Sequence, residues 1–248
     1  MAEFTVDRDS VRVAGFQGYG AQFNQNVFAP VTAKEGVTKK DLAELPGHLE
    51  DLGPQFVRIF FNDVQARDFP DRLQSFYKTL QLAQQSGAMI NVTLQSTAGL
   101  TLSAATTRFA NLLNTAVRTR GVTNLRWVTI QNEPNSTKIT MDAYAQMYEK
   151  LDEHLRAPVD VRKHFKFMGG DLVGTTSPLH ETQDDWFEFL ASPRMAKLLA
   201  AHSVHIYWDH GDTPKIADRL NGVQKIVQSL PKAGRRDAAE SAYLERRT

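Results

Sequence analysis

Cysteine is absent from all 248 residues of the chain. Without a thiol the protein can form no disulfide bond, and it has no thiolate to serve as a nucleophile or as a metal ligand. These two kinds of chemistry are therefore excluded. The redox compartment of the protein cannot be inferred either, because that inference depends on cysteine pairing.

Long apolar runs and an excess of charge of one sign are also absent. No apolar run is long enough to span a bilayer, and residues 1–7 lack the basic and apolar segments of a signal peptide. The net charge of +1 gives no electrostatic footprint for nucleic acid or for a membrane surface. We therefore expect a soluble protein that binds neither of them. A secreted full-length form remains compatible with this sequence.

Motifs for common cofactors are missing as well. The chain contains no Gly-rich phosphate loop, no Gly-x-Ser-x-Gly elbow and no dinucleotide fingerprint, so we expect no cofactor. His202, His205 and His210 suggest a zinc site at first sight. However, residues three apart on a strand face opposite sides, and no carboxylate accompanies these histidines at a ligand spacing. We therefore expect no metal.

Short β-rich runs recur along the chain, each followed by a longer amphipathic stretch, and no linker or repeat divides them. Successive runs begin roughly 32 to 39 residues apart, which is the size of one strand, one helix and two loops. The expected strands are residues 15–23, 56–61, 89–94, 126–131, 164–169 and 202–207. This rhythm is typical of a parallel sheet.

The stretches between these runs predict helices with one apolar face, at residues 71–86, 104–118 and 141–155. Gly87 and Gly121 stand where a helix commonly ends, and Thr140 is a candidate N-cap. The predicted fold class is α/β: an incomplete TIM-type (β/α) barrel with about six parallel strands and surrounding helices. We assign residues 1–236 to this single domain.

The most informative motif is Asn132-Glu133-Pro134, at the end of the fourth expected strand. Proline ends ladder pairing, so an amide and an acid project from the mouth of the barrel, where enzymes of this fold keep their sites. The motif in this position resembles the signature of the clan A retaining glycoside hydrolases. The resemblance implies that Glu133 is the general acid/base and that Asn132 hydrogen-bonds the sugar 2-hydroxyl. A polar loop with a surface glutamate is the alternative interpretation.

Other residues fit the same resemblance. Arg58 lies between apolar residues of the second expected strand, where many clan members hold an arginine that supports the nucleophile; an ordinary surface arginine is the alternative. His205 and Tyr207 share one face of the sixth expected strand and resemble the His-x-Tyr pair of the clan, whose tyrosine contacts the nucleophile. Trp208 offers an aromatic face to a sugar, although core packing would also explain these side chains. Polar side chains at the ends of the first and third strands would complete a sugar-binding surface: Gln22, Asn24 and Gln95.

The tail of the chain departs from the pattern of the clan. A retaining mechanism needs a second carboxylate about 5 to 5.5 Å from the first, and the clan carries it as a glutamate at the end of the seventh strand. Residues 237–248 instead favour helix or disorder, so we expect a tail outside the family pattern and a barrel truncated after its sixth unit. Glu240 or Glu245 would be the substitute nucleophile.

These features predict a glycoside hydrolase-like protein that cleaves or binds β-linked glycosides, with weak or absent turnover. The alternative is a non-catalytic carbohydrate-binding protein or an inactive fragment, in which Asn132 and Trp208 still recognise sugar but no covalent intermediate forms. A six-stranded barrel would also leave two parallel edge strands open. Because identical chains usually associate with two-fold symmetry, we expect a homodimer.

Overall fold

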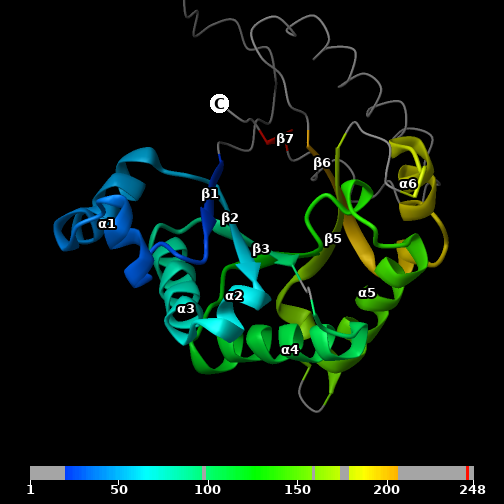
Figure 1. The fold of residues 1–248 in the computed structure, drawn as a ribbon, viewed down its shortest axis with the longest axis horizontal. Helices are drawn as coiled ribbons and strands as arrows, with labels where there is room; N and C mark the ends of the chain where they lie inside the picture. The colour runs from blue at the N-terminus through cyan, green and yellow to red at the C-terminus, as the bar shows by residue number, and fades with distance from the viewer. Residues whose placement is uncertain (1–19, 97–98, 158–159, 174–178, 206–243, 246–248) are drawn as a thin grey trace, which may run out of the picture.

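The computed structural model describes residues 20–96, 99–157, 160–173, 179–205 and 244–245 of the chain. This part forms one sheet with the strand order β1-β2-β3-β4-β5-β6-β7, in which every pairing is parallel. Helices follow most strands and cover the outside of the sheet (Figure 1). The predicted fold class, an α/β fold with about six parallel strands and surrounding helices, is confirmed.

The strands coincide closely with the β-rich runs of the sequence. The predicted starts of the second and third strands are confirmed, and the later strands begin within three residues of the expected positions. Residues 15–19 of the first expected strand and 206–207 of the sixth lie outside the described residues. The strands are β1 Gly20–Asn24, β2 Phe56–Asn62, β3 Met89–Ser96, β4 Leu125–Ile130, β5 Lys166–Leu172, β6 Leu199–His205 and β7 Leu244–Glu245.

The three predicted helices are present, and the described residues contain three more that the apolar pattern did not reveal. Thr140 caps the expected helix through a hydrogen bond from the Ala143 N–H to its hydroxyl, at 3.1 Å. Gly87 and Gly121 follow their helices with φ of 75° and 66°, as expected of glycines that end helices. The α-helices are α1 Lys39–Leu52, α2 Asp63–Asp68, α3 Pro70–Gln85, α4 Leu102–Asn114, α5 Met141–Arg156 and α6 Gln183–Leu190. A π-helical turn, Thr115–Thr119, extends α4, and short 3-10 turns lie at Pro30–Glu35, Pro134–Ser136, Arg162–His164 and Met195–Lys197.

Alternate residues of the strands have two different environments. Val57, Ile59 and Phe61 face the helices and belong to the main apolar core, where the Phe61 and Phe76 rings lie 4.9 Å apart. Their neighbours face the interior of the sheet, and several of these interior residues are buried and polar: Arg58, Asn91, Thr93, Thr129 and Ser203. A buried polar layer of this kind requires internal hydrogen-bond partners, and it becomes the floor of the site described below.

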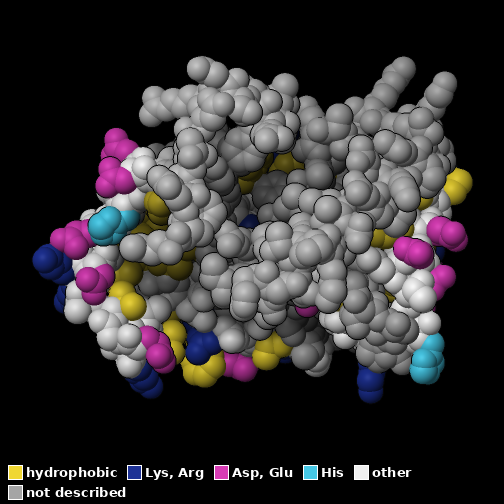
Figure 2. Space-filling view, turned by 90° about the horizontal axis from the view of Figure 1, so that it is seen from above, with side chains coloured by type: hydrophobic (Ala, Val, Ile, Leu, Met, Phe, Trp, Pro, Cys, Tyr) yellow, Lys and Arg dark blue, Asp and Glu magenta, His cyan; other side chains and the backbone are white. Residues whose placement is uncertain are grey.

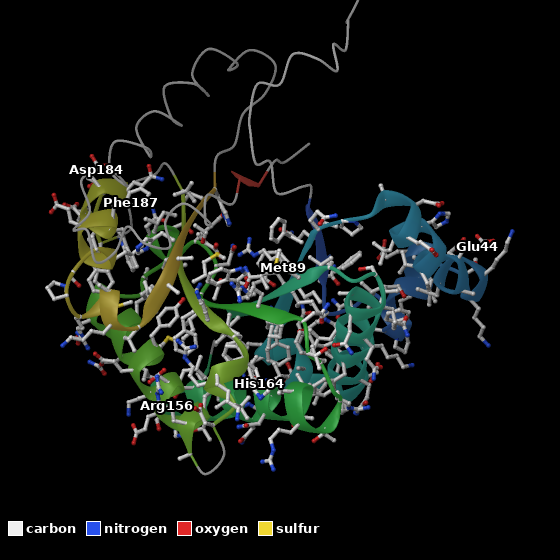
Figure 3. All side chains as sticks on the ribbon, turned by 180° about the vertical axis from the view of Figure 1, so that it is seen from behind. Glu44, Met89, Arg156, His164, Asp184 and Phe187 are labelled. Carbon is white, nitrogen blue, oxygen red and sulfur yellow. The ribbon has the colours of Figure 1, made fainter. Side chains whose placement is uncertain are left out.

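The flanks of the molecule are formed by helices at the two ends of the sheet. Glu44 on α1 and Asp184 on α6 lie on opposite sides of the molecule (Figure 3). Both acidic and basic side chains of the described residues lie along the rim seen from above (Figure 2). Within the described residues, no helix combines the length and the apolar character needed to cross a membrane.

The two described residues of the tail do not show the helix or disorder that the sequence predicts. Leu244–Glu245 form β7, and they pair in parallel with Val204 and His205 of β6. Strand pairing with β6 therefore prevails there over the local preference of an alanine- and arginine-rich segment. The other residues of the tail and the boundary at residue 236 lie outside the described residues, so the domain assignment stays a prediction.

Two tyrosines of α5 link β4 and β5 beyond the short ladder that joins these strands. The Tyr148 hydroxyl accepts a hydrogen bond from the Ile130 N–H at 3.0 Å and donates one to the Met168 carbonyl at 2.6 Å. The Tyr144 hydroxyl accepts a hydrogen bond from the Gly170 N–H at 3.1 Å. The two hydroxyl groups thus lie between β4 and β5. The backbone groups that they bind, on Ile130, Met168 and Gly170, come shortly before Glu133 and Asp171 in the chain.

Replacement of Tyr148 by phenylalanine should lower the free energy of unfolding by about 1 to 3 kcal/mol, because a buried N–H and a buried carbonyl each lose this partner. Burial raises the pKa of Tyr148 well above its ordinary value, so the hydroxyl is protonated and able to donate at neutral pH. Urea unfolding monitored by circular dichroism would measure the loss. Tyr144→Phe is the matched control and should cost less, because its hydroxyl serves one backbone group. An equal or larger loss for Tyr144→Phe would contradict this account.

Candidate active site

The backbone after β4 turns sharply and presents Glu133 at the C-terminal end of the sheet. Gln131 and Glu133 have φ of 59° and 49°, a left-handed conformation that costs non-glycine residues roughly 1 to 3 kcal/mol. Hydrogen bonds hold the turn: the Ser136 N–H donates to the Glu133 carbonyl at 2.9 Å, and the Ser136 hydroxyl donates to the same carbonyl at 2.8 Å. Strain that is supported in this way is common where a side chain must be aimed for function.

Asn135, which the sequence did not single out, joins this turn to the end of β5. Its amide nitrogen donates to the Val173 carbonyl at 2.7 Å, and its amide oxygen accepts from the Val173 N–H at 3.1 Å. Asn135 is fully buried. Its reciprocal bond pair fixes the position of the Glu133 turn relative to the neighbouring strand. The only sequence signal for it is its place directly after Asn-Glu-Pro.

Arg58 lies in the interior layer of β2 and is only 4% exposed. Its Nε donates to the Thr93 hydroxyl at 2.9 Å, and its Nη2 donates to Oδ1 of Asn132, also at 2.9 Å. Nη1 lies 3.0 Å from Nε2 of His205, and Nη2 forms an ion pair with Asp171. The surface-arginine alternative is therefore wrong, and the expectation that a buried strand arginine meets a carboxylate is confirmed. The carboxylate that Arg58 meets among the described residues is that of Asp171, which lies on β5.

Asp171 is the main residue of the site that the sequence interpretation missed. It is the penultimate residue of β5, has φ of 52°, is buried, and accepts a hydrogen bond from the Ser203 hydroxyl at 2.5 Å. Its own backbone N–H donates to the Ser203 oxygen at 2.8 Å. Gly170 before it has φ of 114°, and a Cβ there would lie 2.3 Å from the Ser203 carbonyl oxygen. A glycine followed by an acid at the end of a predicted strand was the available signal.

His205 connects the acidic motif with the buried ion pair. Its Nδ1 lies 2.9 Å from Oε1 of Glu133, and its Nε2 lies 3.7 Å from Oδ1 of Asp171. The imidazole is almost fully buried, whereas the Glu133 side chain is 23% exposed. A carboxyl group of this kind is open to a ligand on one side and positioned by a buried network on the other. The structure thus brings together four predicted site residues: Arg58, Asn132, Glu133 and His205.

Most of the other predicted site residues are exposed on β1 and β3 or lie outside the described residues. Gln22, Asn24 and Gln95 are exposed: Gln22 pairs in register with Arg58 of β2, Asn24 ends β1, and Gln95 precedes the last residue of β3. Their role as a sugar-binding surface stays a prediction. Tyr207, Trp208 and Glu240 fall outside the described residues.

Glu245 is the last residue of β7, and its backbone pairs in register with His205. This register places the backbone of Glu245 at the same end of the sheet as the cluster. The role of Glu245 as a substitute nucleophile nevertheless stays a prediction.

A metal centre finds no support in the described part of the chain. No group of three or more histidine and acidic side chains there has the geometry to hold a metal ion. His202, three residues before His205, is a partly buried histidine whose Nδ1 has no hydrogen-bond partner among the described residues. Burial lowers the pKa of His202 to about 4, so this imidazole is neutral at pH 7.

Comparison with known proteins gives similarity in structure alone, since no protein-family model and no curated protein matches the sequence. The structure of Thermotoga maritima Cel5A with cellobiose is 15% identical with a TM-score of 0.58, and the match covers 86% of this chain and 75% of that chain. A glycoside hydrolase family 30 subfamily 8 xylanase, Xyn30A from Clostridium acetobutylicum, is 12% identical with a TM-score of 0.50, covering 93% and 64%. The E153A variant of GH5_18 from Streptomyces cattleya, in complex with Manβ1-4GlcNAc, is 14% identical with a TM-score of 0.51, covering 82% and 54%. At these identities the similarity shows a glycoside hydrolase-like fold.

Proposed function

We propose that this protein is a glycoside hydrolase-like protein of the retaining clan A type, which binds β-linked glycosides at the C-terminal end of its parallel sheet. In this proposal Glu133 is the general acid/base. The observation that carries the proposal is the contact of the partly exposed Glu133 carboxyl group with His205, beside an Asn132 held by Arg58. The low-identity structural neighbours, of which Cel5A was solved with cellobiose, support the same class of ligand.

The orientation of Asn132 suits a sugar hydroxyl group. Its Oδ1 accepts the hydrogen bond from Arg58 at 2.9 Å, and arginine can only donate. The amide NH2 group is therefore directed away from Arg58 and can donate two hydrogen bonds elsewhere. A contact of this kind to the 2-hydroxyl strengthens in the oxocarbenium-like transition state and lowers the barrier to glycoside cleavage.

In the proposed clan the arginine of this strand supports the nucleophile, but here the described carboxylate that pairs with Arg58 is Asp171. Turnover should therefore be weak or absent. A nucleophile must reach the anomeric carbon, whereas the Asp171 side chain is buried and held by Arg58 and Ser203. Among the described residues, Glu245 is the remaining candidate, on the basis of its backbone register beside His205. A non-catalytic carbohydrate-binding protein is the second candidate function, and the same buried pairing of Asp171 favours it.

A mechanism-based fluorosugar tests the proposal. We expect titration calorimetry to show saturable binding of β-linked disaccharides, and intact mass spectrometry to show no stoichiometric adduct with 2-deoxy-2-fluoro β-glycosides. An adduct on Glu245 would show that β7 supplies the nucleophile and would overturn the expectation of weak turnover. Failure of every β-linked disaccharide to bind would contradict the proposed ligand class.

We also propose that two copies of the chain associate through the open side of the sheet. Within the described residues the sheet has β1 and β7 at its edges, and unpaired parallel edges favour association. Two-fold symmetry is the commonest arrangement for identical chains. Sedimentation velocity over a dilution series should reveal a homodimer that dissociates as the protein is diluted. A monomer at every concentration would contradict this expectation.

A further inference from the structure

The two ring nitrogens of His205 have different kinds of partner. Nδ1 lies 2.9 Å from the Glu133 carboxyl oxygen Oε1, and Nε2 lies 3.0 Å from Nη1 of Arg58. A carboxylate oxygen accepts hydrogen bonds, whereas a guanidinium group only donates them and does not lose its proton in proteins. The imidazole therefore lies between an obligatory donor and an acceptor, and only one arrangement of its protons satisfies both contacts.

Nε2 must be the acceptor in this arrangement. A proton on Nε2 would point at an N–H of Arg58, so neither the Nε2–H tautomer nor the imidazolium can form the contact at 3.0 Å. A single proton on Nδ1 satisfies both partners: Arg58 donates to Nε2, and Nδ1–H donates to Oε1 of Glu133. His205 is then neutral.

Asp171 is the group that would favour the opposite tautomer, because its carboxylate also lies near Nε2. The distance from Nε2 to Oδ1 of Asp171 is 3.7 Å, which is too long for a hydrogen bond. Both oxygens of Asp171 already have donors, since Oδ1 accepts from the Ser203 hydroxyl and Oδ2 from Arg58. Asp171 therefore does not require a proton from His205.

We propose that Arg58 is a positioning residue that fixes His205 as the neutral tautomer with its proton on Nδ1. The consequence for Glu133 is that Oε1 is held as a hydrogen-bond acceptor, so the transferable proton of the acid is carried on Oε2. Arg58 also orients the Asn132 amide through its contact to Oδ1. One buried guanidinium group thereby sets the direction of hydrogen bonding at both Glu133 and Asn132.

Long-range proton–nitrogen correlation spectra of the full chain, labelled with nitrogen-15, test this proposal directly. At pH 7 we expect Nδ1 of His205 to resonate as a protonated nitrogen and Nε2 as an unprotonated one. His202 is the internal reference for a neutral histidine, because burial lowers its pKa to about 4. The Nε2–H tautomer of His205, or a doubly protonated ring, would overturn the proposal.

A pair of variants tests whether Arg58 is the cause. Asp171→Asn retains Arg58 and should leave the proton on Nδ1. The double variant Arg58→Met with Asp171→Asn removes the donor while keeping the buried charges balanced. In the Glu133→Gln background, where the side chain that faces Nδ1 can donate or accept, it should lose the Nδ1–H preference that Asp171→Asn alone retains. An unchanged tautomer of the double variant in that background would overturn the role given to Arg58, and the wild-type spectrum decides the tautomer even if that variant does not fold.

The role given to the Glu133 oxygens rests on the proposed function, but the tautomer does not. Failure of disaccharides to bind would therefore contradict the proposed function and leave the spectroscopic result intact. A wrong tautomer, in contrast, would overturn this inference and leave the sugar-binding proposal standing.

Discussion

Replacement of Glu133 by glutamine is expected to lower whatever residual hydrolysis of β-glycosides with poor leaving groups the wild type shows by roughly 10²- to 10⁴-fold, the usual contribution of a general acid. Glutamine has nearly the same shape and can still accept a hydrogen bond from His205, so the fold and disaccharide binding should be retained. The variant, however, has no proton to give to the leaving oxygen. Reducing-sugar release from β-linked oligosaccharides would measure the loss.

Activated aryl glycosides distinguish loss of the acid from general damage. Their leaving groups need little protonation, so Glu133→Gln should impair them much less than it impairs oligosaccharides. Glu44→Gln is the matched control, because Glu44 lies on α1 at the flank of the molecule (Figure 3). Equal losses on both substrates, or no loss on either, would contradict the role of Glu133.

Replacement of Arg58 by methionine should have the largest effect on stability. It removes the cation from a buried pair and leaves Asp171 charged and buried without that partner, which typically costs about 3 to 5 kcal/mol. A loss of this size is a large part of the 5 to 15 kcal/mol by which folded domains are usually stable. Chemical denaturation of the variant and the wild type would measure the difference in the free energy of unfolding.

Two controls separate the buried charge from the loss of an arginine as such. Arg194→Met removes an arginine that pairs with Asp142 and Glu149 but is 40% exposed, and it should cost about 1 kcal/mol or less. The double variant Arg58→Met with Asp171→Asn should recover much of the lost stability, because no unpaired buried charge remains. If Arg58→Met costs no more than Arg194→Met, the buried pair does not have the role described.

Helices and strands that are marked by a clear pattern of a few neighbouring residues could be predicted from the sequence. Those whose local pattern is weak could not. The buried runs of β2 and β3 and the cap at Thr140 are readable over a few residues, because strand alternation and helix capping depend on near neighbours. Helix α1 was missed because Pro46 and Gly47 lie inside it, and both are poor helix formers. Its capping box between Thr38 and Asp41 was the signal that would have revealed it.

The sequence by itself determined which residue types reach the end of the sheet. Asn-Glu-Pro after a β-rich run predicts an acid at the end of a strand, and an arginine among buried apolar residues predicts a hidden partner. Both inferences use only local pattern and the high cost of a buried unpaired charge. They therefore held for Glu133 and Arg58 without knowledge of the neighbouring strands.

Only the tertiary structure decided how those residues are paired. Asp171 lies 113 positions after Arg58 in the chain, and His205 lies 72 positions after Glu133. The contacts between them depend on the register of β2, β5 and β6, on the left-handed turns at Glu133 and Asp171, and on the α5 tyrosines between two strand ends. A local pattern shows that a buried charge needs a partner, but parallel packing brings several strand ends to one place, and only their positions in space determine which side chain that partner is.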